Sequence, residues 1–245
     1  MRSTLASTCC GPRSGTASDG RLILLLSLVL GCSAWTGGAP ELPTGRVGRP
    51  WYRIGDEAYQ SAGQATLLEV GGRRLVVTAL SNFGSEGGLD PAWSAEEALR
   101  RVEVGGLSDF DAQTVFALSA GGLLALPPAP SAVDDVVAFE VSAGPALQLS
   151  PAPLGVGDAL WLAAELGEAP GLRLAAARVT GVEGAAVTVE LRTAEPLEGS
   201  AGAPLLDAEG RVRGLMTGST VDEGAPGRLR AASAVALLPR LTNLR

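Results

Sequence analysis

The side chains that could do chemistry in this 245-residue chain are few in kind. The sequence contains no histidine and no lysine, since all 19 basic residues are arginine, and its three cysteines are Cys9, Cys10 and Cys32. Imidazole, amine and thiolate groups are the usual bases and nucleophiles near neutral pH. Beyond residue 32, catalysis would have to rest on carboxylates, hydroxyls and backbone amides. Zinc, copper and haem iron lack their usual ligands there, so we expect no metal site and no cofactor.

Composition sets the broad class. The chain is 46% apolar and 18% charged, which indicates a globular protein, and its length suffices for one large all-β unit or two small lobes. The formal net charge is −7, and residues 33–245 alone carry sixteen arginines against twenty-five acids, or −9. An acidic surface repels phosphate backbones, so we expect no nucleic-acid partner.

The N-terminal region has the features of an export signal. Nine apolar residues, Leu22–Leu30, follow Arg21; a membrane span needs about 20, so they fit the core of a signal peptide instead. Residues 1–20 are a long leading segment, which a start codon assigned too early would explain. Val29-Leu30-Gly31-Cys32 resembles a bacterial lipobox, which predicts a signal peptide over 1–32 and lipidation of Cys32.

An ordinary signal peptide, cut near Ser33-Ala34 or Gly38-Ala39, is the alternative interpretation of the leader. Residues 33–50, rich in glycine and proline, are predicted to form a tether. Both interpretations predict export, either to the cell envelope (periplasm or outer membrane, held by a lipid anchor) or as a secreted protein. The anchor would be the only contact with a membrane.

From about residue 51, short apolar runs alternate with turn residues every eight to twelve positions, which is typical of antiparallel β-structure. Ala65–Val70 and Leu75–Ala79 flank Gly71-Gly72, a hairpin signal. The further predicted strands are Arg101–Val104, Thr114–Leu118, Val136–Val141, Ala159–Ala164, Leu172–Val182, Ala186–Leu191, Ala203–Leu206, Val212–Thr217 and Leu229–Ala232.

Two helices are expected. Ser94 and Glu97 have the spacing of a capping box before Ala98-Leu99-Arg100. Ser233–Leu241 is also predicted to be helical, with Pro239 ending or kinking it.

Three segments resemble the trypsin-like serine proteases, most closely the periplasmic heat-shock type. Arg74–Phe83 is similar to the strand that leads into the Thr-Ala-Ala-His motif, and the histidine position holds Ser81. Asp135–Val141 is similar to the strand that opens with the catalytic aspartate. Gly199-Ser-Ala-Gly-Ala-Pro-Leu-Leu-Asp207 resembles the Gly-Asn-Ser-Gly-Gly-Pro-Leu-Val-Asp loop, where Ala201 takes the place of the nucleophile.

The resemblance implies an all-β fold of two six-stranded antiparallel barrels with a short C-terminal helix. The N-terminal barrel is expected over 51–145, and the C-terminal barrel with the helix over 146–245. The triad positions would be Ser81, Asp135 and Ala201, and the amides of Gly199 and Ala201 would form an oxyanion-hole-like nest. Two of the three triad groups are therefore missing, and no other base is available to activate Ser200.

The sequence thus predicts a protease homologue that is not an enzyme and that binds a peptide or protein in the cleft between the barrels. Val212–Thr217 is the strand expected to pair with that ligand. Two alternatives remain open: an active serine endopeptidase whose motifs are misplaced, and a purely structural envelope lipoprotein.

Overall fold

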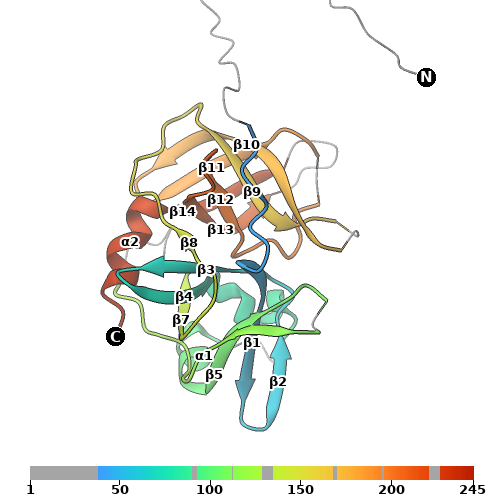
Figure 1. Ribbon diagram of the computed structural model, residues 1–245, viewed down its shortest axis with the longest axis vertical. Coiled ribbons are helices and arrows are strands. Elements are labelled where there is room, and N and C mark those ends of the chain that lie inside the picture. The colour runs from blue at the N-terminus through green and yellow to red at the C-terminus, as the bar shows by residue number, and fades with distance from the viewer. Residues whose placement is uncertain are drawn as a thin grey trace, which may run out of the picture. The chain divides into compact units, whose positions relative to one another are not determined.

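The computed structural model describes residues 38–89, 93–111, 113–128, 135–167, 170–194, 196–220 and 227–245 (Figure 1). Cys32 and the predicted signal peptide lie outside the described residues. Within the described residues, neither α-helix is long and apolar enough to cross a membrane.

The first half of the molecule is an eight-stranded sheet. Its strands are β1 (Val47–Ile54), β2 (Glu57–Gln60), β3 (Ala65–Val70), β4 (Arg73–Thr78), β5 (Val104–Ser108), β6 (Val115–Leu118), β7 (Val137–Val141) and β8 (Leu147–Gln148). Six of them follow the order β6-β5-β1-β3-β4-β7, while β2 pairs with β1 and β8 pairs with β3. Two 3₁₀ turns, η1 (Leu80–Phe83) and η2 (Ser85–Gly87), and the helix α1 (Ala95–Arg101) lie between β4 and β5.

The second half is a closed six-stranded barrel with the order β10-β11-β14-β13-β12-β9. Its strands are β9 (Ala159–Glu165), β10 (Leu172–Glu183), β11 (Ala186–Leu191), β12 (Pro204–Leu206), β13 (Val212–Thr220) and β14 (Arg228–Ser233), and the helix α2 (Ala234–Thr242) follows. Period-two alternation explains these strands: in β11, Val187, Val189 and Leu191 are buried and the residues between them are more exposed.

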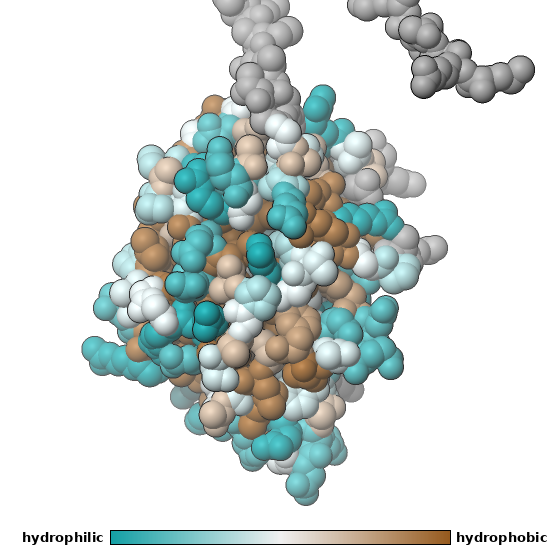
Figure 2. Space-filling model, in the orientation of Figure 1, coloured by the Kyte–Doolittle hydropathy of each residue, from teal (hydrophilic) through white to brown (hydrophobic). Residues whose placement is uncertain are grey.

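Three apolar clusters form the core, and one of them joins the two halves. One fills the first sheet around Tyr52, Phe83 and Phe139, and another fills the closed barrel. The third joins strands of both halves to Leu237 and Leu241 of α2. In Figure 1 α2 lies beside both sheets, and Figure 2 shows hydrophobic side chains interspersed with hydrophilic ones on the face in view. The predicted all-β class with a short C-terminal helix is confirmed.

Local predictions were confirmed where turn and capping residues decide the structure. β3 and β4 form the predicted hairpin, with Gly71 and Gly72 at positive φ of 59° and 79°. Ser94 and Glu97 form the predicted capping box at the start of α1.

Two local predictions were wrong. No strand covers Arg101–Val104, because α1 continues to Arg101 and β5 begins only at Val104. Pro239, predicted to end or kink the C-terminal helix, lies inside α2, so the prediction is wrong as to the helix ending there. The helix continues because Leu237 and Leu241, on either side of the proline, are both fully buried in the shared core.

The boundaries of the halves also differ from the predicted ones. β1 begins at Val47, within the range predicted as a tether, because its residues pair with β3 and then with β5. β8, placed in the second barrel by the sequence, pairs in parallel with β3 and so belongs to the first sheet.

Candidate functional site

Ser81 and Asp135 lie in contact although 54 positions separate them. Ser81 is in η1, directly after β4, and Asp135 comes just before β7; these strands are antiparallel neighbours, so the end of one meets the start of the other. The Ser81 backbone N–H donates to Oδ1 of Asp135 at 2.7 Å, and the Ser81 hydroxyl donates to Oδ2 at 3.1 Å. Ser81 therefore engages both oxygens of the carboxylate.

The pKa of Asp135 is raised above its ordinary value of 3.8. Burial is the largest cause, because it disfavours the charged form. The two hydrogen bonds from Ser81 act in the opposite direction, and the nearby charge of Glu86 raises the pKa further. Among the described residues, no cation offsets the free-energy cost of burying this carboxylate in its charged form.

The wild-type protein is expected to lose stability as Asp135 ionises with rising pH, and replacing Asp135 with asparagine should prevent this loss. Because its pKa is raised, the folded protein holds this proton more tightly than the unfolded chain does. The wild-type free energy of unfolding therefore falls as pH rises from below 3.8 through the raised pKa. D135N retains an acceptor for the Ser81 N–H but has no charge to desolvate, so its stability relative to wild type should rise over the same window. Urea unfolding of both proteins from about pH 3 to pH 7 measures this difference, and a difference constant with pH contradicts the argument.

The turn at residues 199–203 presents no usable hydroxyl. Ser200 is 0% exposed, and both its backbone N–H and its hydroxyl donate to the carbonyl of Leu197. Ala201, at the predicted nucleophile position, is half-buried and carries only a methyl group. If the sequence alignment were shifted by one residue, Ser200 would take the place of the nucleophile, but its hydroxyl is buried and already donates to Leu197.

Residues of the first sheet hold this turn in place. The carbonyl of Ala201 accepts the backbone N–H of Gln64 at 2.9 Å and the side-chain amide of Asn82 at 3.0 Å. The Thr66 hydroxyl donates to the carbonyl of Gly202 at 3.0 Å. Because Asn82 directly follows Ser81, the structure brings together all three predicted triad positions.

An ion pair between the two halves supports the same region. Arg49 of β1 donates to Glu165 of β9 at 2.5 Å and to the Ala62 carbonyl at 2.7 Å. The Gln64 side chain bonds the backbone of Glu165 in both directions, at 3.0 and 3.2 Å. Segment 62–64, which contacts the 199–203 turn, is therefore fixed from both halves.

Asn82, Gln64 and Arg49 are functional-site residues that sequence reasoning missed. Only Asn82 carried a local signal, as a polar residue next to Ser81 in an otherwise apolar run. Gln64 and Arg49 act through partners more than 100 positions away, Ala201 and Glu165. Sequence spacing contains no information on such contacts.

The amides of Gly199 and Ala201, predicted to form a nest, lie in the turn at residues 199–203. Gly199 has φ of 72°, a conformation that favours glycine, and a Cβ there would stand 2.6 Å from the carbonyl oxygen of Ala62. Among the described residues, neither amide N–H has a hydrogen-bond acceptor. Two such N–H groups in a turn can donate hydrogen bonds to an anionic or carbonyl oxygen.

The strand expected to pair with a peptide has its free edge further along than predicted. β12 and the 199–203 turn cover β13 as far as Met216, whose N–H donates to Ala203 and whose carbonyl accepts from Gly202. Beyond that point, residues 217–220 pair with β14 alone among the described residues. The prediction of Val212–Thr217 as the edge is therefore wrong for 212–216, because the barrel closes there.

The site holds no cluster of metal ligands among the residues that the structure describes. None of four cavities of about 200 to 610 Å³ on the described part of the chain is lined by Ser81, Asp135 or Ala201. The described residues include no group of three or more acidic, cysteine or histidine side chains that could bind a metal ion. The chemistry open to this arrangement is therefore hydrogen bonding between its backbone groups and a ligand.

Comparison with one solved structure supports the fold. No protein-family model matches the chain, and no curated protein matches it in sequence. Among solved structures, the protease Anisep from Arthrobacter nicotinovorans superimposes with a TM-score of 0.55 at 9% identity, covering 83% of this chain and 97% of that one. The active form of the Rv3671c protease from M. tuberculosis gives 0.48 at 16% identity, covering 83% and 87% of the two chains. Human heparin binding protein gives 0.47 at 15%, covering 82% and 92%.

Proposed function

We propose that this protein keeps the trypsin-like fold without its catalysis, and binds an extended peptide along residues 217–220. The observation that carries the proposal is the Ser81–Asp135 pair, in which both carboxylate oxygens receive hydrogen bonds from a residue that cannot accept a proton near neutral pH. In the protease mechanism this place belongs to an imidazole, which activates the serine.

The loss of hydrolysis follows from three side chains. Ser81 has no basic nitrogen, Ala201 has no oxygen with which to attack, and the Ser200 hydroxyl is buried and donated to Leu197. Since the sequence contains neither histidine nor lysine, no imidazole or amine can take the role of the base. Backbone N–H donors can stabilise the charge that develops in a transition state, but that charge develops only when a nucleophile attacks.

Peptide binding needs none of the missing groups. The open edge at residues 217–220 offers backbone donors and acceptors, and an extended peptide can add to it as a further strand. This edge begins directly after Met216, which bonds the 199–203 turn, so the free amides of Gly199 and Ala201 lie at one end of it. A peptide carbonyl could then bind these amides while its backbone pairs with β13.

Replacing Gly218 with tryptophan is expected to weaken this binding at least tenfold. A Cβ at Gly218 meets nothing within 4 Å, so the indole fits without disturbing the barrel yet covers the edge. Peptides selected from a random library on the wild-type protein, measured by fluorescence anisotropy, give the affinities. The expected factor corresponds to loss of one or two hydrogen bonds of about 1 kcal/mol each.

Gly38 provides the matched control, because a Cβ there also meets nothing within 4 Å and it lies outside the barrel strands. Gly38→Trp should bind the selected peptides as wild type does. Equal loss in both variants, or failure to select any peptide, contradicts binding at this edge and favours a purely structural role. Cleavage of the selected peptides would favour the active endopeptidase.

A further inference from the structure

A single residue bridges the two ends of the first sheet. Its path ends at β6 and β7, and these strands do not pair with each other. Leu124, six residues after β6, forms an isolated antiparallel bridge with Ala138 of β7, and its N–H donates to the Ala138 carbonyl at 2.8 Å. Elsewhere along this seam the two strand edges face each other without pairing among the described residues.

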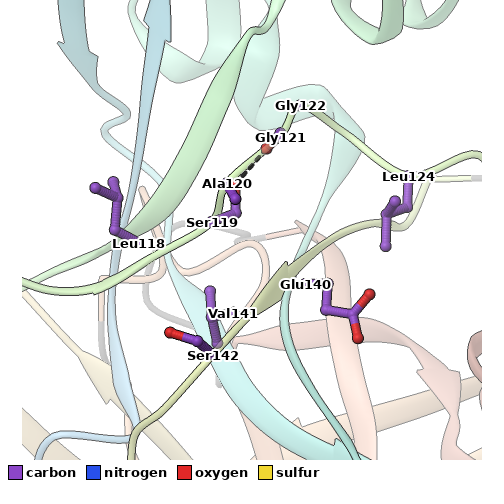
Figure 3. A pocket seen from close by; sticks show the side chains of 9 residues that line it. All are labelled: Leu118, Ser119, Ala120, Gly121, Gly122, Leu124, Glu140, Val141 and Ser142. Atoms are coloured by element: carbon purple, nitrogen blue, oxygen red, sulfur yellow. Dashed lines mark hydrogen bonds between the residues drawn. The ribbon is translucent and has the colours of Figure 1, made fainter.

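A cavity of about 560 Å³ occupies the open part of this seam, and we call it the β6–β7 slot. Figure 3 shows its walls: the chain from the end of β6 through the following turn on one side, and the end of β7 on the other. The lining residues are Leu118, Ser119, Ala120, Gly121, Gly122, Leu124, Glu140, Val141 and Ser142.

Backbone groups of both walls point into the slot. The Ser119 N–H donates to Gly105 of β5, so alternation directs the N–H and C=O of Leu118 away from β5. On β7, the Ala138 carbonyl faces Leu124, so the N–H and C=O of Glu140, two residues on, face the same side. Hydrogen-bonding groups of two strands thus line one space, and only another extended backbone complements both.

The side chains of the slot define the chemistry of its occupant. Glu140 supplies the one charge of the lining, and Arg73 neutralises it through two hydrogen bonds of 3.1 and 2.8 Å. Leu118 is 50% exposed on the edge strand, a large apolar side chain without cover. An uncharged segment that places a β-branched residue over Leu118 therefore fits, and a charged one does not.

We propose that the β6–β7 slot binds an uncharged extended segment of a partner polypeptide, which inserts as a strand between Leu118 and Glu140. Leu124 already makes a contact of this kind, because its N–H donates to the Ala138 carbonyl on the same edge of β7. The slot is formed by the first sheet alone, so this binding is separate from the edge at residues 217–220.

Two synthetic peptides test the proposal by NMR titration of the full-length protein. The probe is Ac-Glu-Thr-Val-Thr-Val-Thr-Lys-amide, whose uncharged centre favours an extended strand and whose charged ends keep it soluble. The second peptide has the same side chains but N-methyl groups on alternate residues, which removes backbone donors. We expect the first to shift the amide signals of residues 118–122 and 140–142 in a saturable way, and the second to bind at least about tenfold more weakly.

Variants of the protein complete the test. Leu118→Asp should abolish the shifts by placing a charge on the edge, whereas Val156→Asp, at a 71% exposed valine of another turn, should not change them. If Leu118→Asp does not fold, Gly121→Trp replaces it, because a Cβ at Gly121 meets nothing within 4 Å. Gly218→Trp should leave the shifts intact. Equal affinity of the two peptides, or the absence of shifts at both walls, overturns the proposal.

Discussion

Replacing Gly202 with alanine should lower the free energy of unfolding by about 4 kcal/mol or more, the largest effect that we expect from a single methyl group. Gly202 has φ of 91°, which L-residues rarely adopt, and a Cβ there would stand 1.9 Å from the Gln64 carbonyl oxygen and 2.8 Å from the Thr78 hydroxyl. Both neighbours belong to the first sheet, and the Thr78 hydroxyl itself bonds the Gln64 carbonyl at 2.5 Å. Neither can move without breaking the contacts that hold the 199–203 turn.

Gly88 separates the cost of the dihedral angle from the cost of the contact. Its φ of 88° nearly equals that of Gly202, but a Cβ there meets nothing within 4 Å. Gly88→Ala should therefore cost only about 1–2 kcal/mol, the strain of the positive φ alone. Chemical unfolding of the two variants measures both values. Similar losses in the two would show that the turn does not pack on the first sheet as described.

Restoring two side chains should raise the hydrolytic activity of the protein above that of the wild type. In Ser81→His/Ala201→Ser, the new imidazole would take the place from which the Ser81 hydroxyl now donates to Asp135, and the new serine would stand on the turn that Asn82 holds. A general base contributes roughly 10²–10⁴-fold to such reactions. We expect hydrolysis of p-nitrophenyl acetate by the double variant at least about 10²-fold above the wild-type rate.

The single variants and Asp135 provide the controls for this gain. Ser81→His supplies an imidazole without the serine, and Ala201→Ser supplies the serine without a base, so each alone should stay well below the rate of the double variant. Adding Asp135→Asn to the double variant should lose most of the gain, because the imidazole would no longer be held in the correct tautomer. A folded double variant with no increase over its single variants contradicts the placement of the three positions.

The sequence was sufficient for the parts of the fold that local patterns encode. Gly71-Gly72 predicted a hairpin, Ser94 and Glu97 predicted a helix start, and three ordered motifs predicted which distant segments meet. The sequence did not predict β1, because Pro50 and two arginines interrupt the alternation of apolar and polar residues in this segment. The structure accommodates this proline where β1 changes partner, pairing with β3 at Val47 and Gly48 and with β2 from Trp51.

The structure brings the predicted positions together through contacts that the sequence did not predict. Motif order was enough to bring Ser81 and Asp135 together, since strand pairing places residues at strand ends side by side. The part played by Asn82 depends on where a buried side-chain amide points, and the burial of Ser200 depends on the curvature of one turn. Both are properties of packing in three dimensions, which residue types and spacing do not specify.

The central claim, that this trypsin-like fold has no serine able to attack, is tested most directly by treating the wild-type protein with a fluorophosphonate and measuring its intact mass. The reagent modifies a serine only when that serine is activated as a nucleophile. Because Ala201 has no hydroxyl and Ser200 is buried and donated to Leu197, we predict an unchanged mass after prolonged incubation. A stoichiometric mass increase that maps to Ser200, and disappears in Ser200→Ala, would contradict the account.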